Sequence, residues 1–139
     1  MRLEKRILIV DDDDAIRALL TTILRRRGFA PDVASNGAEA IEKLEAVHYS
    51  LAILDLMMPR MSGYDVLDRL TAMIPAHRPL VLVLTAGLVL KRLDLSFVIA
   101  TIQKPFDVDL ILDTVIGCLD AAPPEESPEI QLPAPGKPN

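Results

Sequence analysis

Short, uniformly apolar runs recur along the chain. They show no polar alternation, as expected of strands that are covered on both faces of a parallel sheet. The runs are Ile7–Val10, Leu51–Leu54, Leu80–Leu84 and Phe97–Ala100. A weaker run, Pro31–Ala34, contains a proline and is therefore predicted to be an edge strand. The pattern predicts a sheet of five strands.

The segments between these runs have the periodicity of amphipathic helices. In the first segment, apolar residues at positions 16, 19, 20, 23 and 24 form one face, arginines fill the last turn, and Gly28 marks the end. Three further helices are expected to start at a capping residue. These caps are Asn36, with Glu39 in a capping-box-like position, Ser62 and Asp107.

Strands and helices alternate, and this order predicts a doubly wound α/β sheet. Parallel strands need long right-handed crossovers, which helices supply on both faces of the sheet. Five strands and about five helices fit one domain over residues 1–120. Residues 121–139 differ in composition, since they hold six of the eleven prolines together with three glutamates. We interpret them as a disordered tail.

The acidic composition argues against several functions. The formal net charge is −5, so we expect no direct binding to nucleic acid. The most apolar stretch, Leu80–Leu90, is too short to span a bilayer, and we expect no membrane insertion. The N-terminal apolar run stops at four consecutive aspartates, unlike a secretory signal. We therefore expect a cytoplasmic protein.

Some residues that carry chemistry in other proteins have simpler interpretations here. Cys118 is the only cysteine, and we expect it to be a small buried side chain on a helix. His48 and His77 have no partner carboxylate at ligand spacing and are predicted to lie on the surface. Arg25–Arg27 is predicted to be a solvated helix end, with contact to an acidic partner as the alternative.

Polar side chains follow the predicted strands at their carboxyl ends. Asp11 and Asp12 follow the first strand and Asp55 follows the third. Thr85 follows the fourth strand, and Lys104 comes shortly after the fifth. In an open parallel sheet these ends meet in one crevice, where ligands bind. The sequence therefore predicts a common site.

The chemistry of these residue types points to phosphoryl transfer. Three clustered carboxylates repel one another unless a cation lies among them, and hard oxygen ligands suit Mg²⁺. A carboxylate can attack phosphorus to form an acyl phosphate, while the metal and Lys104 neutralise charge on the transferring oxygens. Thr85 offers a hydroxyl donor and Ala86 an unobstructed backbone N–H. Asp13 and Asp14 are interpreted as helix N-terminal charges.

At these positions the sequence resembles the response regulator receiver domains of two-component systems. The resemblance covers about residues 5–120, and its specificity lies in the order and spacing of the motifs. The motifs are Ile7–Asp12, Leu54–Pro59 continuing to Met61–Gly63, Leu84–Ala86 and Lys104–Phe106.

The resemblance implies roles for individual residues. Asp55 would be the phospho-acceptor, and Asp11 and Asp12 would form the acidic pair. The backbone carbonyl of Met57 would join Asp12 and Asp55 on Mg²⁺ or Mn²⁺. The phosphoryl donor would be a histidine kinase or a histidine phosphotransfer protein, and a downstream protein partner would receive the signal.

The resemblance also implies a flavodoxin-like fold with strand order 2-1-3-4-5 and a cis peptide bond between Lys104 and Pro105. Two departures from the family pattern lie just before Lys104. Thr101 stands where the family usually has an aromatic residue or a histidine that swings inward on activation. The segment Gly87–Ser96 is about one helical turn shorter than usual and rich in leucine. Exposed leucines there would form a partner surface, for example for a homodimer through the Gly87–Thr101 face.

Two alternative functions use the same residues. A scaffold with the receiver fold that signals without phosphorylation would fit Thr101 and the short Gly87–Ser96 segment. A phosphatase with an aspartate nucleophile would need a second carboxylate two positions after Asp55, where the sequence has Met57. We therefore expect a phospho-accepting receiver whose only reactions are its own phosphorylation and dephosphorylation, and not an enzyme.

Overall fold

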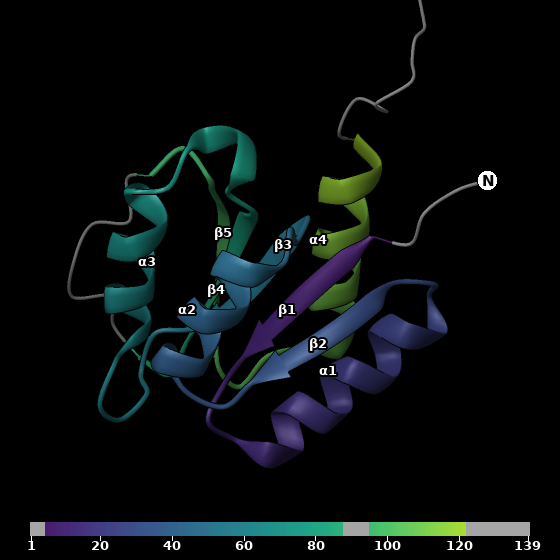
Figure 1. Ribbon diagram of the computed structural model, residues 1–139. Coiled ribbons are helices and arrows are strands. Elements are labelled where there is room, and N and C mark those ends of the chain that lie inside the picture. Colours follow the sequence, from purple (N-terminus) through teal and green to yellow (C-terminus); the bar gives the residue numbers. More distant parts are fainter. Residues whose placement is uncertain (1–4, 88–94, 122–139) are drawn as a thin grey trace, which may run out of the picture.

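A single parallel sheet organises the computed structural model, which describes residues 5–87 and 95–121 (Figure 1). Its strand order is β2-β1-β3-β4-β5, as the sequence predicted. All four strand pairings are parallel, and β2 and β5 form the two edges. The strands are Arg6–Val10 (β1), Ala30–Ala34 (β2), Leu51–Asp55 (β3), Leu80–Thr85 (β4) and Val98–Gln103 (β5).

Helices connect the strands and cover both faces of the sheet. Figure 1 shows α2 and α3 on one face and α1 and α4 on the other, and two separate apolar clusters fill the two interfaces. None of the described helices is long and apolar enough to cross a membrane. The helices are α1 (Asp14–Arg26), α2 (Gly37–Ala46), α3 (Gly63–Thr71), the 3₁₀ helix η1 (Pro75–His77) and α4 (Val108–Ala121).

The central strands are apolar on both sides because both sides are covered. In β1, Leu8 and Val10 pack toward α2 and α3, whereas Ile7 and Ile9 pack toward α1 and α4. All four side chains have no exposed surface. The lack of polar alternation in the sequence thus reflects burial on two faces rather than on one.

The predicted helix ends are confirmed, with one difference in detail. Asn36 accepts a hydrogen bond from the backbone of Glu39, and Ser62 forms a reciprocal capping box with Asp65. The Glu39 carboxylate, however, accepts from the backbone and hydroxyl of Ser35 instead of from Asn36. Gly28 has a φ of +89°, the left-handed conformation that ends α1.

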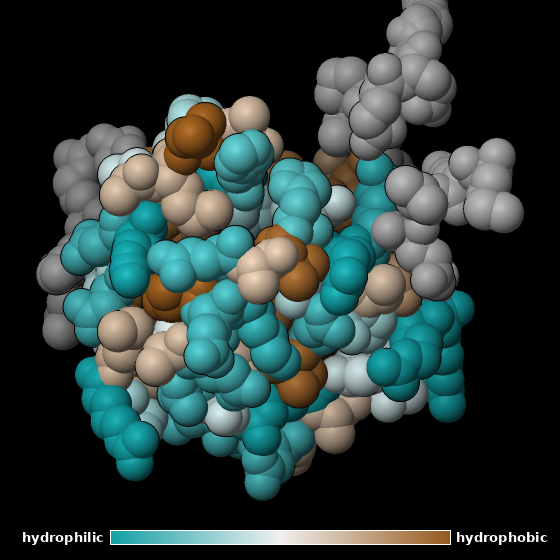
Figure 2. All heavy atoms as spheres, in the orientation of Figure 1, coloured by the Kyte–Doolittle hydropathy of each residue, from teal (hydrophilic) through white to brown (hydrophobic). Residues whose placement is uncertain are grey.

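Several surface predictions can be compared with the structure. His48 and His77 are exposed as predicted, and Cys118 is half-buried against the core beneath α1 and α4. Figure 2 shows that the face seen in Figure 1 is mainly hydrophilic, with apolar side chains in small, separate areas.

Thr101 is exposed on β5. Residues 88–94 and 122–139 lie outside the described residues, so the predictions about the short leucine-rich segment, its dimer face and the tail stay predictions.

Candidate functional site

Three carboxylates meet at the carboxyl edge of the sheet. Asp55 is the last residue of β3, and Asp11 and Asp12 directly follow β1. The two strands are neighbours, with Val10 level with Leu54, so Asp11 and Asp55 lie side by side. One carboxylate oxygen from each of the three residues lies within 4.8 Å of the others. The sequence prediction that these residues converge is therefore confirmed.

Lys104 reaches the same cluster from the end of β5. Its Nζ lies 2.9 Å from Oδ2 of Asp11 and 3.5 Å from Oδ2 of Asp55. The backbone N–H of Lys104 donates to the carbonyl of Thr85 at 2.7 Å, which ties the lysine to the end of β4. The Lys104–Pro105 peptide bond is cis, as the resemblance implied. The cluster thus holds one ammonium among three carboxylates.

Burial dominates the electrostatics of Asp55. The residue is 1% exposed, and desolvation raises the pKa of its carboxyl from 3.8 to about 6. A hydrogen bond from the backbone N–H of Met57, 3.0 Å from Oδ1, opposes this rise, as does the charge of Lys104. The charges of Asp11 and Asp12 add to it. A further cation at this point would favour the ionised carboxylate.

Lys104 stays protonated despite its partial burial. Desolvation alone would lower the pKa of its ammonium. The hydrogen bond and charge of Asp11, together with the charge of Asp55, outweigh desolvation and raise the pKa overall. The ammonium is therefore a fixed positive charge at the edge of the cluster.

Thr85 lies at the same edge, but its hydroxyl has other partners. The side chain is 3% exposed. Its Oγ1 donates to the carbonyl of Gly87 at 3.2 Å and accepts from the backbone N–H of Gly87 at 3.4 Å. The predicted contact between Thr85 and a phosphoryl oxygen would require this hydroxyl to change partner.

Two residues beside the cluster received no individual role in the sequence analysis. A Cβ atom on Gly63 would lie 2.4 Å from the carbonyl oxygen of Asp55, so only glycine allows α3 to begin this close to the end of β3. Arg17 donates to the backbone carbonyl of Asp11. The position of Gly63 directly after a capping serine was a signal that the sequence analysis could have used. Nothing in the sequence pattern singled out Arg17, because its contact depends on how α1 is rotated against the sheet.

The donor set fits a small hard cation. Magnesium binds oxygen ligands at about 2.1 Å, so two ligands on opposite sides of the ion are about 4.2 Å apart. One carboxylate oxygen from each residue of the cluster lies within 4.8 Å of the others, which is close to this spacing. Asp12 is exposed and leaves the cluster open to water, which Mg²⁺ retains in most protein sites.

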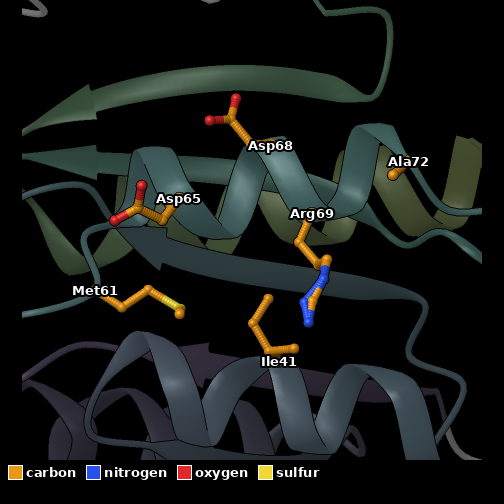
Figure 3. A pocket seen from close by; sticks show the side chains of 6 residues that line it. All are labelled: Ile41, Met61, Asp65, Asp68, Arg69 and Ala72. Carbon is orange, nitrogen blue, oxygen red and sulfur yellow. The ribbon is translucent and has the colours of Figure 1, made fainter.

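A hollow lies between α2 and α3, and no residue of the acidic cluster lines it. Figure 3 shows Ile41, Met61 and Arg69 pointing into the space between the two helices, whereas Asp68 projects from the other side of α3. Arg69 also pairs with Glu45 across the space at 3.7 Å. Among the described residues, the side chains that line the hollow include no group of three or more potential metal ligands. The residues that line it are Ile41, Met61, Asp65, Asp68, Arg69 and Ala72.

Comparison with known sequences gives partial matches to longer regulators. The transcriptional regulatory protein ResD of Bacillus subtilis is 49% identical over 63 residues, which cover 45% of this chain and 26% of ResD. The DNA-binding response regulator MtrA of Mycolicibacterium smegmatis is 41% identical over 64 residues, 46% of this chain and 28% of MtrA. The matched region thus spans about a quarter of the length of these relatives.

Solved structures match over most of the described fold. A CheY-like receiver domain protein from Methanospirillum hungatei has a TM-score of 0.75 at 28% identity, covering 86% of this chain and 96% of that one. The response regulator TrrA of Thermotoga maritima, in complex with Mg²⁺ and BeF, has a TM-score of 0.69 at 36% identity, covering 80% and 96%. A complex of the histidine kinase ThkA with TrrA has a TM-score of 0.71 at 32% identity, covering 83% and 98%.

The family profile described as the response regulator receiver domain matches residues 7–116. This range contains β2 to β5, all of β1 except Arg6, and every residue of the acidic cluster. The chain belongs to the response regulator receiver domain family.

Proposed function

We propose that this receiver accepts a phosphoryl group on Asp55 with the help of Mg²⁺ or Mn²⁺. The observation that carries the proposal is the convergence of Asp11, Asp12 and Asp55 within 4.8 Å, with Lys104 Nζ 3.5 Å from Asp55. Asp11 is also buried and also contacts Lys104 and a backbone N–H, but Lys104 holds its Oδ2 closely, at 2.9 Å. Asp55 is the buried carboxylate whose Oδ2 is held less closely, 3.5 Å from the ammonium. It is therefore the member of the cluster that is best placed as nucleophile.

In the proposed reaction, an oxygen of Asp55 attacks the phosphorus of a phosphohistidine. The new O–P bond forms as the N–P bond breaks, and the histidine ring keeps the electron pair and takes up a proton. Water later attacks the acyl phosphate, which releases inorganic phosphate and restores the carboxylate. Both steps are reactions of the signalling domain on itself, so we infer no turnover of an external substrate.

The surrounding residues supply charge and position. Lys104 would neutralise a transferring phosphoryl oxygen as a point charge. Asp11, Asp12 and Asp55, joined by the backbone carbonyl of Met57, would hold the metal ion, which supplies a further positive charge when bound. Thr85 would turn its hydroxyl from Gly87 toward a phosphoryl oxygen.

The partner that fits this chemistry is a protein that carries phosphohistidine. TrrA, which resembles this chain, forms a complex with the histidine kinase ThkA. We propose a histidine kinase or a histidine phosphotransfer protein as donor and a protein as the downstream target. MtrA is named as a DNA-binding regulator, but its match is limited to 28% of its length. For residues 1–120 we propose a receiver domain that does not itself bind nucleic acid, and for residues 121–139 a tail.

A phosphorylation assay tests the proposal. The protein is incubated with acetyl phosphate and Mg²⁺, and intact mass is measured for the wild type, for Asp55→Asn and for Asp68→Asn, an exposed carboxylate on α3. We expect a phosphate adduct in the wild type and Asp68→Asn, and none in Asp55→Asn or after chelation of the metal. An adduct that persists in Asp55→Asn would remove Asp55 from its role. No adduct in the wild type would favour the scaffold that signals without phosphorylation.

A further inference from the structure

Arg17 ties the first turn of α1 to the acidic cluster. Its Nη1 donates to the backbone carbonyl oxygen of Asp11 at 2.7 Å, and its Nη2 contacts the carboxylate of Asp14. The side chain of Arg17 is 16% exposed, whereas that of Asp14 is 92% exposed. The buried end of this interaction is therefore the contact with the backbone of Asp11.

That contact completes the hydrogen bonding of Asp11. Its backbone N–H donates to Ala34 at 3.2 Å, Oδ1 accepts from the N–H of Asp13 at 2.9 Å, and Oδ2 accepts from Lys104. The carbonyl oxygen, bound by Arg17, belongs to the peptide unit that joins Asp11 to Asp12. Because a peptide unit is planar, fixing this oxygen also fixes the direction in which the chain enters Asp12.

Asp12 depends on this support more than its neighbours do. It is exposed, and within the described residues no hydrogen bond or ion pair holds its carboxylate. Asp11 and Asp55, in contrast, are held by Lys104 and by backbone N–H groups. The position of the Asp12 carboxylate is thus set mainly by its backbone.

We infer that Arg17 is a positioning residue that holds the Asp11–Asp12 peptide so that both carboxylates face one cation. This inference rests on the proposed function, since it concerns the proposed metal ligands. It deepens that proposal by adding a residue that touches neither the metal nor the phosphoryl group.

A positioning role and simple electrostatics predict opposite changes in Mg²⁺ affinity when Arg17 is removed. Arg17 is a positive charge beside a cation site, and by Coulomb's law alone its removal would strengthen Mg²⁺ binding. If Arg17 positions the ligands, its removal weakens Mg²⁺ binding, as is typical when a residue that orients metal ligands is lost. The direction of the change therefore separates the two roles.

The experiment measures the affinity of the metal-free protein for Mg²⁺ by calorimetric titration. The variants are Arg17→Gln, Arg17→Lys and the control Arg26→Gln, which removes an equal charge from the exposed far end of α1. We expect Arg17→Gln to bind Mg²⁺ about tenfold more weakly. Arg17→Lys keeps the charge but loses the planar fork, and we expect a smaller weakening that is still measurable. The control should stay within about twofold of the wild type.

Unchanged or tighter Mg²⁺ binding in Arg17→Gln would overturn the inference. Circular dichroism and melting temperature without metal show whether each variant is folded. If Arg17→Gln does not fold, Arg17→Lys decides, and an affinity equal to the wild type would overturn the inference. A wild type that does not bind Mg²⁺ would overturn this inference and the proposed metal site together. A wild type that binds Mg²⁺ alongside unchanged Arg17 variants would overturn only this inference.

Discussion

The ammonium of Lys104 lies 2.9 Å from Oδ2 of Asp11, although the two residues are 93 positions apart in the sequence. The contact joins the end of one edge strand to the end of a central strand across β3 and β4. Asp11 has no exposed surface, so without this ammonium its carboxylate would be buried beside two others. In the absence of metal, the ammonium of Lys104 therefore offsets the repulsion among the clustered carboxylates.

This arrangement predicts opposite effects of removing Lys104. Lys104→Met should lower the free energy of unfolding of the metal-free protein by about 1–3 kcal/mol, because buried carboxylates lose a charged partner. The same change should raise the affinity for Mg²⁺, because a competing positive charge is gone. Melting temperatures with and without Mg²⁺ measure both effects. A variant whose melting temperature rises less on Mg²⁺ addition than that of the wild type would contradict the prediction.

The raised pKa of Asp55 predicts a pH-dependent cost of folding. The pKa is 3.8 in the unfolded chain and about 6 in the folded protein, so the folded state binds the proton more tightly. The metal-free protein should lose up to about 3 kcal/mol of stability from this group as pH rises from 4 to 7. Asp55→Asn cannot ionise and should escape this loss.

Urea denaturation of both proteins at pH 5 and pH 7.5, in the presence of a chelator, measures this effect. The stability of Asp55→Asn relative to the wild type should increase as pH rises. This increase should be smaller when Mg²⁺ is added. An equal difference between the two proteins at both pH values would show that Asp55 titrates normally.

The close packing of Gly63 predicts a large effect of a single methyl group. Gly63→Ala would place Cβ 2.4 Å from the Asp55 carbonyl oxygen and 2.6 Å from the Leu56 Cα, both backbone atoms. The end of β3 or the start of α3 would have to move, and we expect a loss of about 2–4 kcal/mol. The displaced Asp55 should also be phosphorylated more slowly.

Gly117 provides the matched control for this change. It lies inside α4, and apart from its chain neighbours and the backbone of its own helix nothing lies within 4 Å of an added Cβ. Gly117→Ala should therefore stabilise the protein by about 0.5–1 kcal/mol through helix propensity. Chemical denaturation of both variants gives the comparison. Similar effects at the two positions would mean that the contact at Gly63 is relieved easily.

A polar network at the edge of the sheet predicts that the protein loses stability in acid. Tyr49, 1% exposed, donates to Oδ2 of Asp32 at 2.7 Å, and Arg6 binds the same oxygen at 2.7 Å. Burial alone would raise the pKa of Asp32, but these two partners outweigh it and lower the pKa. Because the folded pKa is lowered, the stabilisation is present above pH 4 and is lost as pH falls through the folded value.

Tyr49→Phe should therefore cost about 1–2 kcal/mol at pH 7 and less below pH 3. The double variant with Asp32→Asn should show that the two changes are not additive. A cost of Tyr49→Phe that is constant over this pH range would point to lost packing instead of to the bond with Asp32.

Much of the sheet could be predicted because its central strands, β1, β3 and β4, are short and buried on both faces. The end of β5 could not be predicted from the pattern, because the apolar run stops at Ala100 while the strand continues to Gln103. Thr101 and Gln103 are exposed, and only Ile102 between them is buried, so polar residues interrupt the apolar run at this end of the strand. The irregular register between β4 and β5 at Val81 and Leu82 also left no mark in the pattern.

The candidate site was predictable to the extent that strand ends determine it. Asp11, Asp12, Asp55 and Lys104 converge because each lies at or just after the carboxyl end of a strand. The contact of Arg17 with Asp11 could not be predicted in this way. It depends on the rotation of α1 and on a rotamer, and neither is fixed by residue spacing.

The topology of the sheet also determines when the site can exist during folding. Because β4 lies between β3 and β5, Lys104 reaches Asp11 only after the last strand has docked. A chain emerging from the ribosome with β5 still missing would present carboxylates without their ammonium. Under the proposed function, the capacity to be phosphorylated would then arise late, when the sheet is complete.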